Sequence, residues 1–480
     1  MTEPSLKEKT ARGLLWGGMA GVLSQLMNAI FGICLLRLLT PKDYGMVQVL
    51  AVFSGVAACL QESGFIAALA NKKNPTHADY NAVFWFNILC GAVCYIILFA
   101  CAPLIAEFYN EPRLVALARF AFLGFFISGF GIAQRAYLFG HLMVRQSAVI
   151  STAALLFSGA CGVALAWFGM AYWGLAAQSI IYVAVIVVMN WWYSPWRPTW
   201  DINFRPIREM FGFSSKLLLT SLFGQVNKNV LSTLLGKFYD TTTAGYYGNA
   251  SKWNDMGANL IHGMIVGVAQ PVLAQVNDDK QRYRQVFRKM LRFASFVSFP
   301  AMLGLGYVAR EFILVTAGPV WTKSAILLSL LSIYGAFVPI NTLYANLVVS
   351  RGKSNVNLIN TVVSCILIWA AMIGLRHYDL KIMVTAFVAI NIGWLLVWHY
   401  FAWRLVGLRL TDVLKDILPF AAVTLLAIGL SWLATQNIEK PIYLLAARIV
   451  TTAMAYIGLL YILKAQVLRE SISFILKKKK

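Results

Sequence analysis

Apolar segments follow one another almost without interruption from residue 13 to residue 463. About fourteen stretches of roughly 20 apolar residues alternate with short charged turns, and each is long enough to cross ~30 Å of hydrocarbon as a helix. The runs are continuous rather than alternating, which predicts helices. The expected fold class is therefore an all-α integral membrane protein with about fourteen transmembrane helices. We predict the spans at residues 13–38, 44–68, 82–105, 114–138, 148–168, 171–191, 210–236, 243–270, 287–309, 324–349, 355–375, 381–403, 415–434 and 441–463.

The composition supports lipid as the solvent of this chain. Charged residues make up only 12% of the 480 residues, whereas soluble domains carry about 25%. The net charge of +22 could indicate nucleic-acid binding, but the basic residues are spread over many short loops, so no nucleic-acid partner is expected. The seven cysteines lie within apolar spans and show no metal-type spacing, which predicts neither a disulfide framework nor a metal site.

The distribution of Lys and Arg predicts the orientation of the chain in the membrane. If the N-terminus is cytoplasmic, the cytoplasmic segments hold 27 Lys and Arg residues and the opposite side holds 9. Because cytoplasmic loops carry the excess of positive charge, both termini are expected in the cytoplasm, which requires an even number of spans. Lys7, Lys9 and Arg12 precede the first apolar run with no small-residue cleavage site, so we expect this run to be a span and not a cleaved signal.

A shift of 200 residues aligns chemically similar positions in the two halves of the chain. The aligned pairs are Gln25 and Gln225, Leu35 and Leu235, Arg37 and Lys237, and Gly45 and Gly245. The shift covers about six spans, an even number, so the halves keep the same orientation, as in transporters built from parallel repeats. The expected domains are an N-lobe (1–191), a cytoplasmic linker (192–209), a C-lobe (210–403), and two further spans with a basic tail (404–480).

Polar side chains recur at membrane depth on the leading span of each half. In the first span, Gln25 and Asn28 are three residues apart and share one helical face. Gln225 and Lys228 repeat that spacing in the seventh span. Polar groups in lipid usually face a bundle interior or an aqueous cavity, so these stripes predict two walls of one cavity. Hydrogen bonding between buried helices is the alternative.

The eighth span carries Lys252 and Asp255, spaced for an ion pair on one helical face. In a functional interpretation, Asp255 accepts a coupling proton or cation and Lys252 contacts an anionic substrate; in a structural one, the two form a static buried pair. Lys216 can reach the cytoplasmic interface or contribute to the cavity. Asn87, one turn into the third span, is a candidate for lining a portal.

No constellation of catalytic residues is found in the sequence. There is no carboxylate-rich loop, no Cys/His cluster and no glycine-rich phosphate loop followed by Lys and Ser or Thr. We therefore expect neither an enzyme nor a cofactor.

Several short segments resemble bacterial polysaccharide-biosynthesis exporters. They are residues 35–45 (LLRLLTPKDYG), 61–65 (QESGF), 82–87 (AVFWFN), 102–106 (APLIA) with Phe108 and Tyr109, 194–198 (SPWRP) and 244–247 (AGYY). The similarity covers residues 10–400. Glu62 departs from the aspartate expected in this family.

The resemblance implies the O-antigen and capsule type of lipid-linked oligosaccharide flippase, within the multidrug/oligosaccharidyl-lipid/polysaccharide exporter superfamily. The implied fold has two six-helix lobes in a V around a central cavity, plus two C-terminal helices. The implied substrate is an undecaprenyl-pyrophosphate-linked oligosaccharide, moved from the cytoplasmic to the outer leaflet of the bacterial inner membrane by alternating access. A Na⁺ or H⁺ gradient would drive the step. Arg37, Lys216, Lys228 and Lys252 are candidates for the positive charge that receives the pyrophosphate. Membrane lipids, a glycan polymerase and other polysaccharide-assembly proteins are the implied partners.

Other functions remain open at this point. A multidrug/cation antiporter of the same superfamily would need anionic side chains in its cavity, whereas the charges within these spans are mostly cationic. A flippase for peptidoglycan lipid precursors would suit the same number of spans. A membrane glycan polymerase or ligase would present a large external loop, which this chain lacks, and a duplicated polar stripe argues against a passive scaffold.

Overall fold

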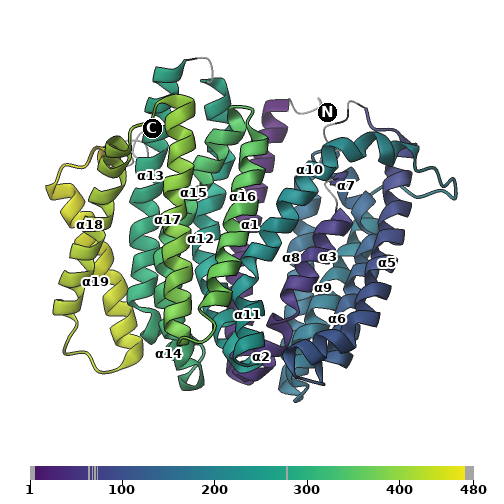
Figure 1. Cartoon of the computed structure of the whole chain (residues 1–480), viewed down its shortest axis with the longest axis horizontal. Coiled ribbons are helices and arrows are strands. Elements are labelled where there is room, and N and C mark those ends of the chain that lie inside the picture. The colour runs from purple at the N-terminus through teal and green to yellow at the C-terminus, as the bar shows by residue number, and fades with distance from the viewer. Residues whose placement is uncertain are drawn as a thin grey trace. The chain divides into compact units, whose positions relative to one another are not determined.

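The computed structural model describes residues 6–62, 65, 66, 69, 72, 74–276 and 279–470, without the side chains of residues 6–20, 62, 211–217, 220, 266–268, 270, 271, 274 and 275. All regular structure in these described residues is helical (Figure 1). The chain forms two compact units, Met1–Gly245 and Tyr246–Lys480. The expected all-α fold is confirmed, whereas the predicted lobe and linker boundaries stay a prediction.

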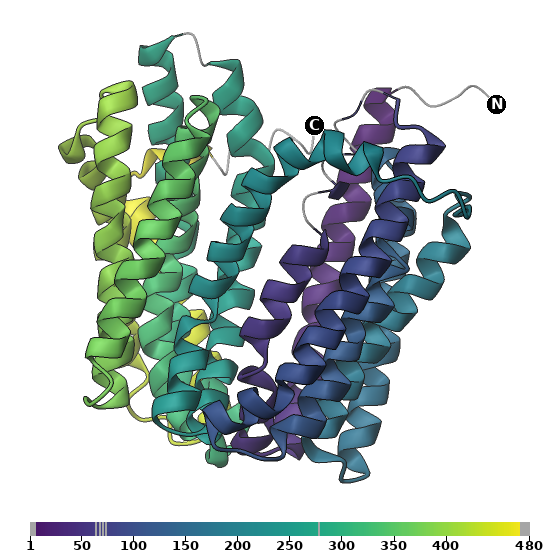
Figure 2. The same ribbon diagram turned by 45° about the vertical axis from the view of Figure 1, so that its right-hand side comes forward.

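Unit 1 is built from long helices joined by short turns. α5, α6, α8 and α9 run side by side, with contacts between α5 and α6, α6 and α9, and α8 and α9 (Figure 1, Figure 2). The described helices of this unit are α1 (Leu6–Leu38), α2 (Pro41–Gln48), α3 (Ala51–Glu62), α5 (His77–Tyr109), α6 (Leu114–Gly129), α7 (Ile132–Gly140), α8 (Val144–Trp167), α9 (Ala171–Tyr193), α10 (Arg205–Lys228), α11 (Val230–Phe238) and the first turn of α12 (Thr241–Gln275).

Unit 2 contains the rest of α12 and a helix bundle centred on α13 and α15. α13 packs against α15 and α18, and α15 packs against α17. Its other helices are α13 (Lys280–Tyr307), α14 (Ala309–Thr316), the short 3-10 helix η1 (Pro319–Trp321), α15 (Thr322–Ser350), α16 (Ser354–Gly374), α17 (Leu380–Val406), α18 (Leu410–Ala434) and α19 (Pro441–Ile462).

Within the described residues, 11 helices are long and apolar enough to span a membrane, or 12 if the bent pair α6 and α7 counts as one span. The chain is therefore a multi-pass membrane protein, and the predicted number of about fourteen spans is not confirmed. The predicted spans 210–236 and 243–270 are not among these 11 membrane-spanning candidates. Both contain side chains outside the described part of the chain.

Three predicted spans are broken helices rather than continuous ones. Span 44–68 begins as α2 and α3, span 114–138 is α6 and α7 bent by 47°, and span 210–236 comprises most of α10 and α11. A break leaves carbonyl groups without a helical partner, and in lipid each must be satisfied elsewhere. At the break between α6 and α7, the carbonyl of Phe130 accepts a hydrogen bond from the indole Nε1 of Trp191 at 2.7 Å.

Side-chain caps define where several helices start. Thr40 with Asp43 at α2, and Thr76 with Asp79 at α5, form reciprocal capping boxes, in which each side chain satisfies a backbone N–H of the first turn. Asp279 caps α13, and hydrogen bonds from the backbone N–H groups of Arg282 and Gln281 hold the pKa of its carboxyl below the usual range. The first two caps are Thr-x-x-Asp patterns, which are readable from the sequence.

Helix α2 and the start of α12 cross at two glycines that the 200-residue shift aligns. A Cβ on Gly45 would overlap the carbonyl of Thr241, and a Cβ on Gly245 would overlap the carbonyl of Pro41. The two contacts are reciprocal, because 41 and 241 are themselves 200 residues apart. Such reciprocity is the mark of a local two-fold relation. At this crossing, the backbones of two segments that the 200-residue shift aligns are in direct contact. Only glycine, which has no Cβ, permits so close an approach.

Candidate functional site

Two predicted site residues of the first span lie on α1. Gln25 and Asn28 are both half-buried. Arg37, in the last turn of the same helix, is exposed. The counterpart of Arg37 in the repeat, Lys237, donates from Nζ to the carbonyl of Phe108 at 2.6 Å and lies over the Phe108 ring. Lys237 is thus tied to the end of α5.

The predicted residues of the seventh span lie on α10, which packs against α3 and α5. The side-chain oxygen Oε1 of Gln225 lies 3.0 Å from where a Cβ on Gly55 would be, so α10 and α3 approach closely at this point. Lys228 is exposed in the last turn of α10. The side chain of Lys216 lies outside the described residues.

Asn87 is fully buried on α5. Its amide nitrogen donates to the carbonyl of Val83 at 2.8 Å, and its Oδ1 has no hydrogen-bond partner within the described part of the chain. The backbone of Asn87 lies against Gly129 of α6, where a Cβ would come within 2.9 Å of the Asn87 carbonyl. Asn87 therefore sits at a tight helix–helix contact.

Lys252 and Asp255 lie one turn apart on α12, and both are half-buried. The predicted ion pair between these two side chains remains a prediction. Asp255 is within electrostatic range of the hydroxyls of Tyr247 and Tyr334. The proposed coupling role of Asp255 remains a prediction.

Unit 1 contains a cavity of about 360 Å³ that the sequence analysis did not anticipate. Its walls come from α3, α6, α7 and α9. The lining is mostly apolar with a small set of polar groups, and the volume falls within the roughly 300–1,000 Å³ of small-molecule sites. The polar lining residues are Ser54, Gln61, Ser128, Arg135, Ser179, Tyr182 and Asn190.

Gln61 fixes one wall of this cavity. It is 2% exposed, and its Nε2 donates to the carbonyl of Phe125 at 2.7 Å. The hydroxyl of Ser128 donates to Oε1 of Gln61 at 2.6 Å. These two bonds join α3 to α6, and Gly91 of α5 allows the close fit because a Cβ there would lie 2.9 Å from Nε2 of Gln61.

Arg135 supplies the one charge among the described lining residues. It lies on α7, it is exposed, and the phenol of Tyr182 on α9 is within electrostatic range of its guanidinium. No Asp or Glu is found among the lining residues that the structure describes. A guanidinium with hydroxyl and amide neighbours suits an anionic, hydrogen-bonding ligand.

The segment between α9 and α10, residues 194–204, is bound along the start of α5. Asn81 donates to the carbonyl of Asp201 at 2.5 Å and accepts from the backbone N–H of Thr199 at 2.9 Å. The indole of Trp85 donates to the Thr199 carbonyl at 2.8 Å. We call this region, where the segment crosses α5, the linker end of unit 1.

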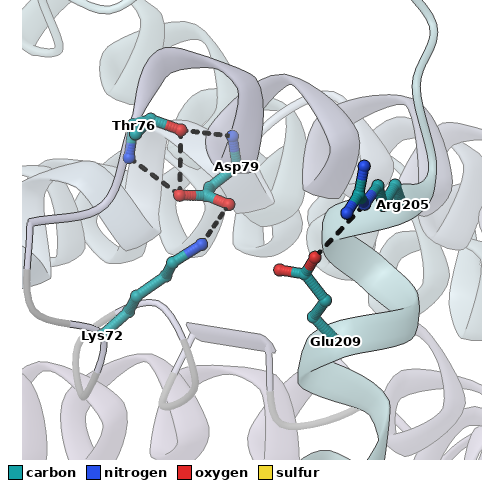
Figure 3. Close-up of polar contacts among 5 residues, drawn as sticks. All are labelled: Lys72, Thr76, Asp79, Arg205 and Glu209. Atoms are coloured by element: carbon teal, nitrogen blue, oxygen red, sulfur yellow. Dashed lines mark hydrogen bonds and ion pairs between the residues drawn. The ribbon is translucent and has the colours of Figure 1, made fainter.

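Charged groups also mark the linker end (Figure 3). Lys72 pairs with Asp79 at 2.6 Å, beside the capping box that Asp79 forms with Thr76. Arg205 and Glu209, on the first turn of α10, pair at 3.5 Å. The ring of Tyr80 lies 5.5 Å from Tyr137 of α7, so α7 and its Arg135 belong to the same end.

Unit 2 carries a polar pair at a position that resembles the Gln61 bond. Nδ1 of His262 on α12 lies 2.9 Å from the hydroxyl of Thr342 on α15. Gln61 and His262 are 201 residues apart, close to the repeat shift. In each half of the chain, the hydrogen bond joins the second predicted span to the fourth. The repeat seen in the sequence is therefore also seen in these side-chain contacts.

The described residues contain no group of three or more His, Cys, Asp or Glu side chains placed to hold a metal ion. None of the seven cysteines, all of which the structure describes, forms a disulfide.

Three cavity residues were missed in the sequence because their signals were assigned to other roles. Gln61 lies in the segment 61–65 that carries the resemblance, and Arg135 lies inside the predicted span 114–138. Asn190 ends span 171–191 and drew no attention. A polar residue inside a predicted span is the signal that could have found all three.

Fold and site together define a multi-span helical transporter. The structure titled "Lipid II flippase MurJ, inward closed conformation" is similar to this chain with a TM-score of 0.76 and 13% identity, covering 95% of this chain and 100% of that one. This likeness concerns the fold alone.

Similarity in sequence identifies the family. The chain belongs to the polysaccharide biosynthesis protein family, whose model matches residues 34–326. It is 24% identical over 359 residues to the lipopolysaccharide biosynthesis protein WzxC of Escherichia coli (strain K12), covering 74% of this chain and 72% of WzxC. It is 22% identical over 469 residues to the teichuronic acid biosynthesis protein TuaB of Bacillus subtilis (strain 168), covering 95% and 96%. The resemblance read from the sequence is confirmed.

Proposed function

We propose that this protein is a flippase that moves a lipid-linked oligosaccharide from the cytoplasmic to the outer leaflet of the bacterial inner membrane. The observation that carries the proposal is its family, together with relatives named for the biosynthesis of lipopolysaccharide and teichuronic acid over most of their length. A multi-pass helical chain suits a step in which a polar glycan must cross hydrocarbon.

The charges of the described residues favour an anionic headgroup. Among the described lining residues of the unit 1 cavity, the one charged group is the guanidinium of Arg135, and Lys228 and Arg37 are exposed on helices with polar stripes. A pyrophosphate pairs more strongly with fixed cations in a medium of low dielectric constant than in water. These charges favour a pyrophosphate over a cationic drug as the substrate, and therefore the flippase over the multidrug antiporter.

The proposed cycle uses alternating access. The pyrophosphate and its sugars would bind the cationic and polar side chains, including Gln25, Asn28, Gln225, Lys228 and Lys252, while the polyprenyl chain stays in the bilayer. A Na⁺ or H⁺ gradient would drive the return, with Asp255 as the proposed acceptor. Peptidoglycan precursors are also glycans linked to a lipid through pyrophosphate. The identity of the glycan therefore distinguishes a polysaccharide flippase from a peptidoglycan-precursor flippase.

A reconstituted system tests the proposal. The purified full-length chain is placed in vesicles with a fluorescent undecaprenyl-pyrophosphate-linked sugar, and the fraction of probe protected from a membrane-impermeant quencher is followed over time. We expect the chain to accelerate exchange of the glycolipid between leaflets and to leave a fluorescent phospholipid unaffected. Equal rates for both lipids would show unspecific lipid scrambling, and uptake of a cationic dye without glycolipid exchange would favour the antiporter.

A further inference from the structure

Unit 2 contains an apolar groove between α13, α14 and α19, with a volume of about 440 Å³. Small residues on two of its walls, Ala301 and Gly304 of α13 and Ala453 of α19, leave space between the helices. Ile449 and Ile457 of α19 also line the groove and are about half exposed. α19 is a candidate membrane span with few buried side chains, so the groove opens on a surface that faces lipid.

One end of this groove is polar. The guanidinium of Arg448, on α19, pairs with Glu311 of α14 at 3.0 Å and lies over the ring of Tyr307 of α13. The side chains of Arg448 and Glu311 are only 16% and 9% exposed. Thr452, one turn further along α19, is 6% exposed. The groove therefore ends at charged and hydroxyl groups that are largely removed from water.

Four polar atoms at this end have no hydrogen-bond partner among the described residues. They are Nε of Arg448, Oε2 of Glu311, Oγ1 of Thr452 and the hydroxyl of Tyr307. Buried polar groups are nearly always hydrogen-bonded, because an unpaired group keeps the full cost of its desolvation. Arg448 and Thr452 also line the groove itself. A ligand that offers both acceptors and donors at this end would supply the missing partners.

The polar end lies near one interface of the membrane. Tyr443 in the first turn of α19 and Tyr461 in its last turn are both exposed, and aromatic side chains collect at the two interfaces of a bilayer. Arg448 follows Tyr443 by about 8 Å along the helix, and helical side chains lean toward the N-terminus. The guanidinium is therefore close to the headgroup layer, and the apolar part of the groove extends toward the middle of the bilayer.

We propose that this groove binds a phospholipid whose headgroup carries a phosphate and a primary ammonium, of which phosphatidylethanolamine is the simplest example. The phosphate accepts hydrogen bonds from Arg448, and the ammonium donates to the carboxylate of Glu311. One acyl chain lies along the groove past Thr452. The occupant is a lipid of the surrounding bilayer, so this site is separate from the one proposed for the transported glycan.

The charges of the site favour this headgroup over others. Arg448 and Glu311 neutralise each other, so a headgroup with one positive and one negative charge matches the pair, whereas a purely anionic headgroup also meets the carboxylate. A choline headgroup has no N–H group to donate to Glu311. The acyl chain contributes little selectivity, because the lipid outside the groove is equally apolar. The headgroup therefore decides which lipid occupies the groove.

Filling the groove tests the place of the acyl chain. A Cβ on Gly304 meets no atom within 4 Å, so Gly304→Leu projects into the groove without a backbone clash. Gly429→Leu is the matched control, because a Cβ on Gly429 of α18 also meets no atom within that distance.

Removing both charges tests the place of the headgroup. The double variant Arg448→Gln with Glu311→Gln leaves no unpaired charge behind and removes the charge complementarity. Its control is the double variant Arg288→Gln with Asp416→Asn, which removes another buried pair of unit 2 that does not line the groove.

The delipidated full-length chain is incubated in detergent with equal amounts of phosphatidylethanolamine, phosphatidylcholine and phosphatidylglycerol that carry the same acyl chains. Bound lipid is counted by native mass spectrometry. We expect phosphatidylethanolamine to be retained at least about fivefold over each of the other two, the factor that one net hydrogen bond supplies. Both groove variants should lose this preference, and both controls should keep it. Melting temperatures identify the variants that fold, and Gly304→Leu decides alone if the double variant does not.

Equal retention of the three lipids by the wild type would overturn the inference, and so would a preference for phosphatidylcholine or phosphatidylglycerol. A preference for phosphatidylethanolamine that survives in either folded groove variant would place the lipid elsewhere on the chain. Loss of the preference in a folded control would show that it does not depend on this groove. None of these results depends on whether the chain transports a glycan.

Discussion

At the scale of single residues, charged side chains lie in two environments. Asp416 of α18 is almost fully buried and holds Arg288 of α13 through two hydrogen bonds of 2.6 and 3.2 Å. Glu311 and Arg448 form a second buried pair at 3.0 Å. Lys228, in contrast, is exposed on α10. Buried pairs of this kind hold helices together, and the exposed Lys228 is one of the cations proposed to contact the substrate.

Replacing Lys228 with Ala should abolish export of the glycan while the protein level is maintained, since the ammonium is proposed to pair with the pyrophosphate. Export is measured in vesicles and in cells by surface glycan. Lys381→Ala, an exposed lysine at the start of α17, is the matched control and should export normally. Normal export by the Lys228 variant would remove this residue from the mechanism.

Replacing Asp416 with Asn should lower the free energy of unfolding by about 1–3 kcal/mol, because the partly buried Arg288 loses its charged acceptor. The measurement is a thermal melt in detergent. The matched variant Glu209→Gln breaks the exposed pair with Arg205 and should cost no more than about 0.5 kcal/mol. Equal melting temperatures for both variants would show that the buried pair adds nothing.

At the scale of elements, the structure resolves several apolar spans into pairs of helices with defined joints. The joint between α6 and α7 is held by Trp191, and the α3–α6 contact is held by Gln61 and Ser128. α2 and the start of α12 meet through Gly45 and Gly245. Each of these contacts satisfies a backbone group or permits a close approach that lipid alone would not allow.

Replacing Gly45 with Ala should destabilise the protein by about 1–3 kcal/mol, because the new methyl group overlaps the Thr241 carbonyl and backbone has to move. Gly245→Ala should behave alike, since its methyl group meets the Pro41 carbonyl. The control is Gly224→Ala, where a Cβ meets no atom and helix propensity favours Ala. Wild-type melting temperatures for both crossing variants would contradict the close contact.

At the scale of the whole molecule, the family and the all-α multi-span fold are established, and the orientation of the termini is a prediction. It depends on the excess of Lys and Arg in alternate loops. α16 offers a direct test, because its 21 residues extend about 32 Å and its two ends must face opposite sides if it spans the membrane.

We expect a cysteine at His377 to react with an impermeant thiol reagent from outside the cell, and a cysteine at Lys353 to react only after permeabilisation. Both positions are exposed loop residues next to α16. The seven native cysteines are replaced first, so that only the introduced thiol is labelled. The reverse labelling pattern would place both termini outside the cytoplasm.

The sequence by itself determined the membrane class, the helical fold and the family, because hydrophobicity, charge and turn chemistry are properties of local segments. It also indicated the repeat, including the pairing of Gly45 with Gly245. Only the tertiary structure decided which polar side chains meet. Gln61, Ser128 and Arg135 come together from three different helices. A cavity exists only between elements, so its residues cannot be read from the spacing within any one of them.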